Sequence, residues 1–471
     1  RYFTSIKTRG PFWGQKLFDS NDRIAFEFPL NSGSALNFAL SKDFAFAKVV
    51  IPNYQYQVSQ PENFNPKTGV FSAIQFTEPE LVFLDKNNGS KHTDFHPMRG
   101  LTTNLPFDNS LNGKVFSSDV NLGIICPTQY CDPLYNFLNA INQTHKAGVN
   151  PDYLLDFPGF LSAFRIPLNI PLANSTKWQD VQADHTIGDS KTSAIDLARK
   201  ITTSIDRLCG TNKGLIVVIF IPNEWQNFRT FEDEFEKFNL HDYIKAYAAQ
   251  KGISTQLIEE DTLNDGLKCQ IYWWLSLSFY VKSLRTPWVL SNLDKTTAFA
   301  GIGYSVSKTG NNTEIVLGCS HIYNSEGQGL KYKLSRIEDF VLDRKSNPFM
   351  SYNDAYQFGV SICELFYNSM GDLPKRVVVH KKTHFTKDEI NGIKNSLAQA
   401  GIKQVDLVEI SFESEARFLA TRIYSNQLQI DGFPISRGSC VLIEPNTALL
   451  WTHGIVPSVR NPNYKFYLGG R

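Results

Sequence analysis

The sequence predicts an α/β protein, because apolar strand patterns alternate with helical patterns over most of its length. The run GLIVVIFIP at residues 214–222 is apolar throughout, which is typical of a strand buried on both faces of a parallel sheet. Residues 194–208 before it carry apolar side chains at helical spacing. Strand and helix patterns then alternate to residue 284, which indicates a doubly wound α/β domain.

A second α/β unit is predicted from residue 297 onward. In chain order, its expected elements are strands over 298–306 and 314–319, a helix over 352–369, a strand over 376–380, a helix over 388–400, a strand over 405–410 and a late hairpin over 440–444 and 448–451. The first two strands are expected to pair as a hairpin. This order of elements predicts a ribonuclease-H-like fold.

Residues 1–76 are predicted to be β-rich, because short apolar runs there are separated by Asn, Gly and Pro. Between this segment and the first α/β domain we expect a strand over 120–126 and a helix that begins near residue 134. The sequence Phe157-Pro158-Gly159-Phe160 predicts a buried turn.

The composition indicates a soluble globular protein, since 42% of the 471 residues are hydrophobic and 20% are charged. A chain of this length is enough for about three domains with a substantial core. The formal net charge of +1 excludes a protein coated in basic patches. If nucleic acid binds, we therefore expect it to bind in a local channel.

Seven cysteines without regular spacing indicate reduced thiols and a cytoplasmic location. Cys126 and Cys131 lack the two further ligands that a zinc site would need. The sequence contains no apolar run of about 18 residues and no signal peptide, so we expect no membrane span. Because the chain starts at Arg1 and stops at Arg471 in a loop-like run, we expect both ends to be incomplete.

One stretch, residues 241–282, places four polar side chains where they can converge. His241 and Lys245 are four residues apart and share one helix face, and Gly252 ends that helix. Gln256 lies in the next strand, at 253–258, and Lys282 lies in the last turns of a helix over 268–284 that Pro287 stops. Two ammonium groups, an amide and an imidazole suit a phosphate with a stacked base. Each residue alone is equally compatible with a helix cap or a surface side chain.

These four positions resemble the 5′-phosphate pocket of the MID domain of Argonaute proteins. The family pattern is an aromatic or histidine, a lysine one turn later, a glutamine in the next strand and a distant lysine. The segments HDYIKA and GISTQ resemble the corresponding segments of short prokaryotic Argonautes. So do EPELVF at 78–83, His92, Asp94 and the run PMRGL at 97–101.

The resemblance covers about residues 77–471. It implies a MID domain with its lead-in region over 77–290 and a PIWI domain over 291–471 whose C-terminus is incomplete. Residues 1–76 would then be either an APAZ-like tail or an extension that pairs with one.

The metal-binding carboxylates of an active PIWI domain are expected to be missing. In the family, the strand that matches AFAGIGYSV carries an Asp where this chain has Gly303, and the segment that matches VVVHKKTHF carries an Asp where it has Lys382. Glycine offers no ligand, and an ammonium opposes cation binding. Asp388 and Glu389 nearby are expected to be first-turn acids that interact with a helix dipole.

The resemblance therefore implies a catalytically inactive short Argonaute. Such a protein would bind a small 5′-phosphorylated guide RNA, with Mg²⁺ at the guide phosphate, and would recognise complementary single-stranded DNA of plasmids or phage. It would then activate an APAZ-containing effector, a TIR or sirtuin-like protein that consumes NAD, in antiviral defence by abortive infection. Two alternatives remain: an active guide-directed nuclease, and a guide-free protein that binds single-stranded nucleic acid.

Overall fold

The computed structural model describes most of the chain between residues 73 and 452 and short strands before it. The described residues are 48–51, 54–57, 64–65, 70–71, 73–114, 117–148, 154–173, 175–183, 190–211, 214–232, 237–291, 294–309, 312–321, 331–337, 340–343, 347–411, 421–425, 427–430, 437–444 and 446–452. The chain forms two compact units, one of Arg1–Pro79 with Ser411–Arg471 and the other of Glu80–Ile410.

The described part of the first unit consists of antiparallel strands, so the expected β-rich character of the N-terminal segment is confirmed there. Its strands are β1 (Lys48–Ile51), β2 (Tyr54–Gln57), β3 (Phe64–Asn65), β4 (Val70–Phe71), β5 (Ala73–Gln75), β23 (Thr421–Tyr424), β24 (Gln427–Ile430), β25 (Ser439–Glu444) and β26 (Thr447–Leu450). β25 and β26 form the expected late hairpin, and β5 pairs with β25, which places residues 73–75 in one sheet with residues 439–450.

The second unit contains a parallel sheet in the order β10-β8-β11-β14, with β9 also paired to β8. Its strands are β8 (Val120–Ile125), β9 (Leu168–Asn169), β10 (Trp178–Gln179), β11 (Ile216–Ile221) and β14 (Ser254–Glu259). All six residues of β11 are buried, as its continuous apolar sequence predicts. The α/β fold class is therefore confirmed.

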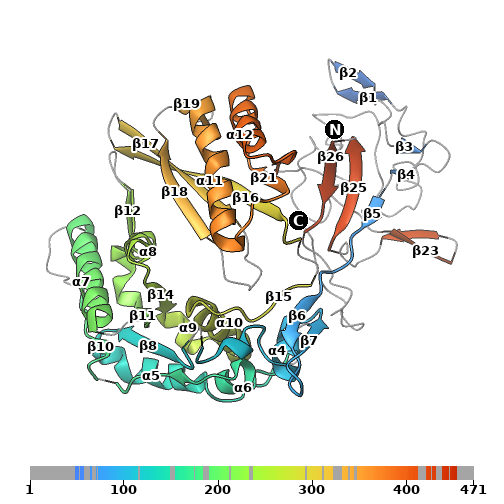
Figure 1. The fold of residues 1–471 in the computed structure, drawn as a ribbon. Helices are drawn as coiled ribbons and strands as arrows, with labels where there is room; N and C mark the ends of the chain where they lie inside the picture. The colour runs from blue at the N-terminus through green and yellow to red at the C-terminus, as the bar shows by residue number, and fades with distance from the viewer. Residues whose placement is uncertain are drawn as a thin grey trace. The chain divides into compact units, whose positions relative to one another are not determined.

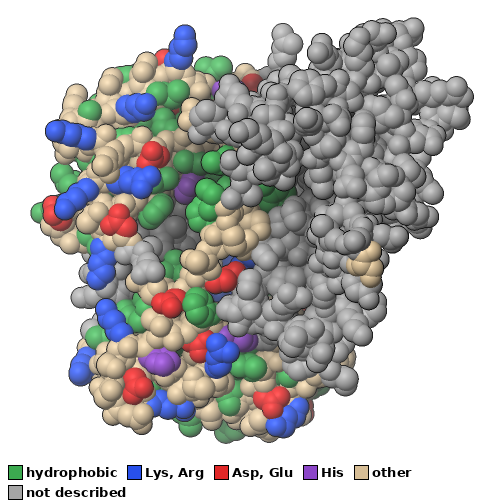
Figure 2. Space-filling view, turned by 90° about the vertical axis from the view of Figure 1, so that its right-hand side faces the viewer, with side chains coloured by type: hydrophobic (Ala, Val, Ile, Leu, Met, Phe, Trp, Pro, Cys, Tyr) green, Lys and Arg blue, Asp and Glu red, His purple; other side chains and the backbone are tan. Residues whose placement is uncertain are grey.

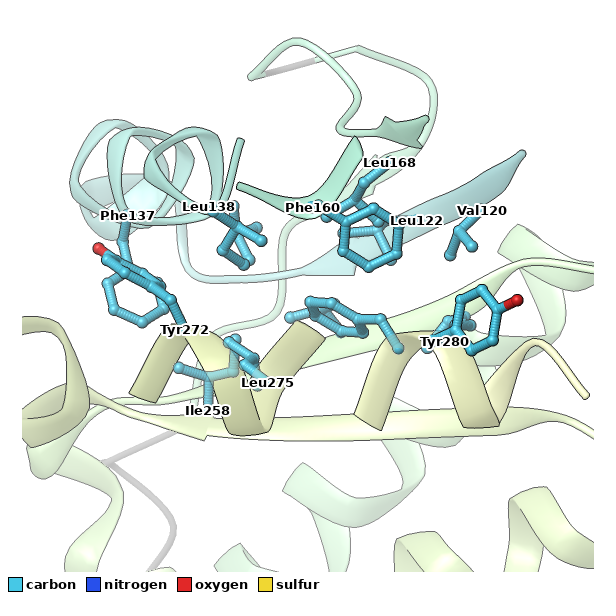
Figure 3. Close-up of a cluster of buried hydrophobic side chains, with 14 of the residues drawn as sticks. Val120, Leu122, Phe137, Leu138, Phe160, Leu168, Ile258, Tyr272, Leu275 and Tyr280 are labelled. Atoms are coloured by element: carbon cyan, nitrogen blue, oxygen red, sulfur yellow. The ribbon is translucent and has the colours of Figure 1, made fainter. Parts of the chain in front are cut away.

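Helices cover both faces of this sheet (Figure 1). One face packs against α5 (Cys131–Ala140), α6 (Phe160–Phe164) and α10 (Lys268–Lys282). Figure 3 shows the side chains of this layer, including Leu122 of β8, Phe137 of α5 and Leu275 of α10. The other face packs against α7 (Ser190–Thr211) and α8 (Leu240–Gln250).

Shorter elements complete this half of the second unit. They are β6 (Leu81–Leu84), β7 (Lys91–Asp94) and β15 (Val289–Leu290) in one antiparallel sheet, α4 (Pro97–Thr103), α9 (Glu260–Asn264), the hairpin of β12 (Thr230–Glu232) and β13 (Lys237–Asn239), and the 3-10 turns Asn109–Leu111, Thr128–Tyr130 and Asn223–Phe228. In the expected Phe-Pro-Gly-Phe turn, Phe157 and Phe160 are both fully buried.

The remainder of the second unit is a mixed sheet in the order β18-β17-β16-β21-β22. Its elements are β16 (Thr297–Thr309), β17 (Asn312–His321), β18 (Lys331–Ile337), β21 (Arg376–Lys381), β22 (Gln404–Glu409), α11 (Tyr352–Met370), α12 (Lys387–Gln399) and the hairpin of β19 (Phe340–Leu342) and β20 (Pro348–Met350). β16 pairs antiparallel with β17 and parallel with β21. The apolar faces of α11 and α12 pack on β16 and β21.

Element boundaries differ from the sequence-based expectations by a few residues at most. The largest difference that affects the site is the end of α10, which the sequence placed near residue 284. The helix ends at Lys282, because Leu284 adopts a left-handed backbone conformation with φ 62°. No helix among the described residues is long and apolar enough to cross a membrane.

A buried polar network fixes the chain directly after α10. Arg285 and Asp108 form an ion pair at 2.9 Å in which both side chains are 1% exposed. The Asp108 carboxylate also accepts hydrogen bonds from the Tyr280 hydroxyl and, at 2.9 Å, from the Thr286 backbone N–H. Arg285 donates further to the Ser117 carbonyl at 2.9 Å. Three donors around one carboxylate satisfy its charge in the interior.

We predict that Asp108→Asn lowers the free energy of unfolding by about 3–5 kcal/mol, because it leaves the guanidinium of Arg285 buried without a counter-charge. Asp406→Asn is the matched control, since the Arg376–Asp406 pair is about half exposed on both sides. That control is expected to cost about 0–1 kcal/mol. Urea denaturation of both variants measures the difference, and equal midpoints would contradict the prediction.

Candidate functional site

The candidate site lies on β14, the terminal strand of the parallel sheet. Side chains of a strand alternate between the two faces, so Thr255 faces α8 while Gln256 faces α10. Leu257 and Ile258 follow the same alternation, because Leu257 packs in the core with α8 and Ile258 in the core with α10. An edge strand in this position can therefore receive polar groups from both helix layers.

Lys245 reaches the edge strand from α8. Its Nζ donates to the Thr255 carbonyl oxygen at 2.6 Å and to the Thr255 hydroxyl at 3.0 Å. The helix that carries it starts at the N-cap Asn239, whose side chain accepts from the Asp242 backbone N–H. Gly252, with φ 68°, provides the left-handed turn that leads from this helix into β14.

Lys282 reaches the same strand from α10, on the opposite face of the sheet. Its Nζ donates to Gln256 Oε1, and the Ser278 hydroxyl donates to the same oxygen at 2.8 Å. The amide of Gln256 donates in turn to the Leu257 carbonyl at 2.8 Å. Ser254 fixes the helix end, because its hydroxyl donates to the Lys282 carbonyl at 2.8 Å.

The two ammonium groups are close enough to repel each other. The pKa of Lys282 is lowered from 10.5 to about 8, first by burial and second by the charge of Lys245. Burial also lowers the pKa of Lys245. Among the described residues, the acceptors named above are neutral oxygens, so they leave both charges uncompensated. An arrangement of this kind binds an anion well, because an anion removes the repulsion and forms charge-assisted hydrogen bonds.

The structure thus brings Lys245, Gln256 and Lys282 to one strand edge. His241 lies one turn before Lys245 on α8 with its side chain 58% exposed. Its Nδ1 is 3.0 Å from a carboxylate oxygen of the neighbouring Asp242. The exposed ring is free of core packing, and its role in base stacking stays a prediction.

The two positions expected to lack metal ligands lie where the parallel pairing of β16 and β21 ends, Gly303 within β16 and Lys382 directly after β21. Ile302 of β16 and Lys381 of β21 are partners in the register, and Gly303 and Lys382 each follow directly. Gly303 is exposed, and a Cβ built on it would meet open space. Lys382 is exposed as well. Their lack of carboxylate oxygens is a fact of the sequence, and its consequence for catalysis stays a prediction.

Sequence reasoning missed a buried ion pair beside these positions. Lys381 and Glu389 are joined at 2.6 Å, and their side chains are 1% and 0% exposed. Aromatic rings surround the ammonium, with Phe349 at 4.4 Å, Phe385 at 5.5 Å and Tyr304 at 5.6 Å from Lys381 Nζ. The available signal was the capping box Thr386-x-x-Glu389, which predicts a helix start but not the partner of the carboxylate.

Glu389 is a structural acid in the first turn of α12, as the sequence suggests. One carboxylate oxygen accepts from the Thr386 backbone N–H at 2.9 Å, and the other accepts from the Met350 N–H at 3.1 Å and the Tyr304 hydroxyl at 3.2 Å. Within the described ranges, no three His, Cys, Asp or Glu side chains are grouped so that they could hold a metal ion.

Surface charge is mixed rather than concentrated. Figure 2 shows Lys and Arg side chains scattered among Asp and Glu over the described part of one face. The local pair of Lys245 and Lys282 therefore differs from a general basic coat, in agreement with the net charge of +1.

We predict that Lys381→Met lowers the free energy of unfolding by about 3–5 kcal/mol, because Glu389 would remain buried without a counter-charge. The double variant Lys381→Met with Glu389→Leu is expected to recover most of this loss. Lys382→Met is the adjacent control, and because this side chain is exposed, the loss of its contacts is expected to change stability by about 0–1 kcal/mol. Thermal unfolding measures all three, and a larger loss for Lys382→Met than for Lys381→Met would contradict the register.

No protein-family model matches the sequence, and no curated protein matches it either. Solved structures do match. A structure of Clostridium butyricum Argonaute bound to a guide DNA and a 19-mer target DNA aligns with TM-score 0.54 and 16% identity over 92% of this chain. A. aeolicus Argonaute aligns with TM-score 0.48 and 17% identity over 83%, and Drosophila Piwi with TM-score 0.46 and 12% identity over 80%.

The chain spans about half the length of these proteins, covering 50%, 46% and 44% of them in the same order. The first alignment matches nearly the whole chain, through both α/β parts of the second unit, at an identity that bears on fold alone. Together with the parallel sheet at whose edge strand Lys245, Gln256 and Lys282 meet and the mixed sheet that follows it, this match shows that the chain has an Argonaute-like fold.

Proposed function

We propose that this protein binds the 5′-phosphate of a guide strand at Lys245, Gln256 and Lys282. The observation that carries the proposal is the meeting of two lysines, from opposite faces of the sheet, at one edge strand with lowered pKa values for both. A terminal phosphate supplies the negative charge that the cluster lacks. Its oxygens can replace Thr255 and Gln256 as acceptors for the two ammonium groups.

The guide is proposed to be a small RNA, and the target complementary single-stranded DNA. Base pairing would supply sequence specificity, while the protein holds phosphates. His241 is proposed to contact the first base, a role supported by its place one turn before Lys245 and by its exposed ring. His241→Ala should then weaken guide binding by about 1–3 kcal/mol, and an unchanged affinity would leave it a surface residue.

The expected Mg²⁺ at the guide phosphate does not follow from the described residues. The cluster offers two ammonium groups, which repel a dication, and amide and carbonyl oxygens that already accept hydrogen bonds. A bound Mg²⁺ would be held mainly by phosphate oxygens of the guide and by water. We propose that the lysines neutralise most of the phosphate charge, and the Mg²⁺ stays a prediction.

We further propose that recognition is not followed by cleavage, because Gly303 and Lys382, at the positions where carboxylates would be needed, offer no carboxylate oxygen. A protein that recognises without cutting must transmit the event by a difference in affinity between its free and target-bound states. The proposed receiver is an APAZ-containing effector, of the TIR or sirtuin-like kind that consumes NAD, in defence against plasmids or phage.

Residues 1–75 are the proposed contact with that effector, because the sequence there is rich in aromatic residues that favour burial. Tyr2, Phe3, Phe12, Trp13 and Phe18, which motivate the idea, lie outside the described residues. Deleting residues 1–75 and measuring association with the effector chain tests the assignment. Intact association together with intact guide binding would contradict it.

Lys245→Ala combined with Lys282→Ala should weaken binding of 5′-phosphorylated RNA far more than binding of the same RNA with a 5′-hydroxyl. Each lysine is expected to contribute about 1.5–3 kcal/mol through its charge-assisted contacts. Fluorescence anisotropy with the two RNAs measures the selectivity. Equal losses for both RNAs would contradict the phosphate assignment.

The pH dependence of RNA binding provides a second test of the same site. The pKa of Lys282 is lowered to about 8, so the side chain is charged at pH 7 and loses its proton as the pH rises through 8. Affinity for 5′-phosphorylated RNA should therefore fall by up to about tenfold between pH 7 and 9. Lys282→Arg is the control, because a guanidinium stays charged throughout and should flatten the profile.

The unmodified protein, loaded with guide and given a matched DNA target with Mg²⁺ or Mn²⁺, is expected to release no cleavage product. Gel analysis of end-labelled target measures this outcome. A guide-dependent cut at one fixed position would favour the alternative of an active nuclease. Copurified RNA with a narrow length distribution and a 5′ phosphate would indicate a guide-binding protein, either inactive or an active nuclease. It would argue against a guide-free nucleic-acid-binding protein.

A further inference from the structure

Helix α10 is apolar on nearly all sides, although only one face packs in the core. Two adjacent tryptophans show the difference between the buried and the exposed face of the helix. Trp273 is 2% exposed and its indole N–H donates to the Leu155 carbonyl at 2.8 Å, whereas Trp274 is 45% exposed. Leu267 and Val281, seven residues before and after Trp274, are exposed as well. The outer face of α10 thus presents an indole ring in a strip of apolar surface.

This outer face is continuous with the candidate phosphate site. Trp274, Ser278 and Lys282 are spaced four residues apart, so they form one row of neighbouring side chains along the helix. The two later members of the row donate to Gln256 Oε1. Trp274 is the next position in that row, about 12 Å along the helix axis from Lys282.

We propose that Trp274 is a stacking platform for a base of the bound guide strand, close to but not at its 5′ end. A strand anchored through its 5′ phosphate at Lys282 and Gln256 has its next nucleotides within reach of this ring. An exposed indole offers its face to any base, which suits a guide of arbitrary sequence. Leu267 and Val281 offer the apolar flanks against which sugar and base edges pack.

The proposal rests on the proposed function, since it needs a strand bound at the phosphate site. It goes further by assigning a residue that holds the strand beyond its terminal phosphate. The geometry favours nucleic acid over a protein partner, because the row that contains Trp274 ends at Lys282, whose ammonium donates to the neutral Gln256 amide and meets Lys245 from the other face of the sheet. Unchanged RNA affinity in the test below would leave this face to another partner.

The test compares Trp274→Ala and Trp274→Phe in the full chain, with two probes: adenosine 5′-monophosphate and a 5′-phosphorylated oligoadenylate of six nucleotides. Trp274→Ala should weaken hexamer binding by about five- to a hundredfold and leave the mononucleotide unchanged within about twofold. Trp274→Phe keeps an aromatic face and should retain most of the hexamer affinity. Tyr367→Ala, at another exposed aromatic side chain on α11, is the matched control and should change neither affinity.

Unchanged hexamer affinity in Trp274→Ala, with 5′-phosphate selectivity intact, would overturn the stacking assignment and leave the phosphate site standing. Equal weakening of both probes would overturn it too. If the unmodified protein does not distinguish 5′-phosphate from 5′-hydroxyl hexamer, the proposed function itself fails. If Trp274→Ala does not fold, Trp274→Gln at this exposed position takes its place with the same expected result.

Discussion

The repulsion between Lys245 and Lys282 is the constraint on which the candidate site depends. Both ammonium groups are drawn to one strand edge by neutral acceptors, Thr255 from one face and Gln256 from the other. This requires α8 and α10 to pack on opposite faces of the sheet with β14 at its end. The positive charge of the two lysines is not neutralised within the cluster. The packing of α8 and α10 on the sheet holds the two ammonium groups together against their repulsion.

Lys381 is also a buried lysine, but a carboxylate neutralises its charge. There the ammonium is fully buried and paired with the carboxylate of Glu389, whose oxygens also accept backbone and hydroxyl donors. A closed pair of this kind stabilises the end of β21 and the start of α12 and has no charge left for a ligand. Among the described residues Lys282 instead donates to an amide oxygen, which is why Lys282 rather than Lys381 is the proposed ligand-binding lysine.

The position of Lys282 depends in turn on the network around Asp108. Arg285 follows three residues later, and its pairing with Asp108 fixes the chain where α10 ends. The residues of this network come from a loop near residue 108 and from the end of α10, more than 150 residues later. Long-range polar contacts thus orient a site whose own residues lie within one short stretch of sequence.

The sequence alone determined the strands and helices, because burial on two faces and helical spacing leave clear patterns, as in β11 and α11. It also predicted that Lys245, Gln256 and Lys282 converge, since all three lie within 38 consecutive residues and resemble a family pattern, and their role in binding stays a prediction. Only the tertiary structure decided that His241 stays exposed, that Lys381 rather than Lys382 is buried with Glu389, and that β5 pairs with β25. These outcomes depend on contacts between segments that are distant in the sequence. A local pattern of residues does not predict which distant residue a side chain will contact.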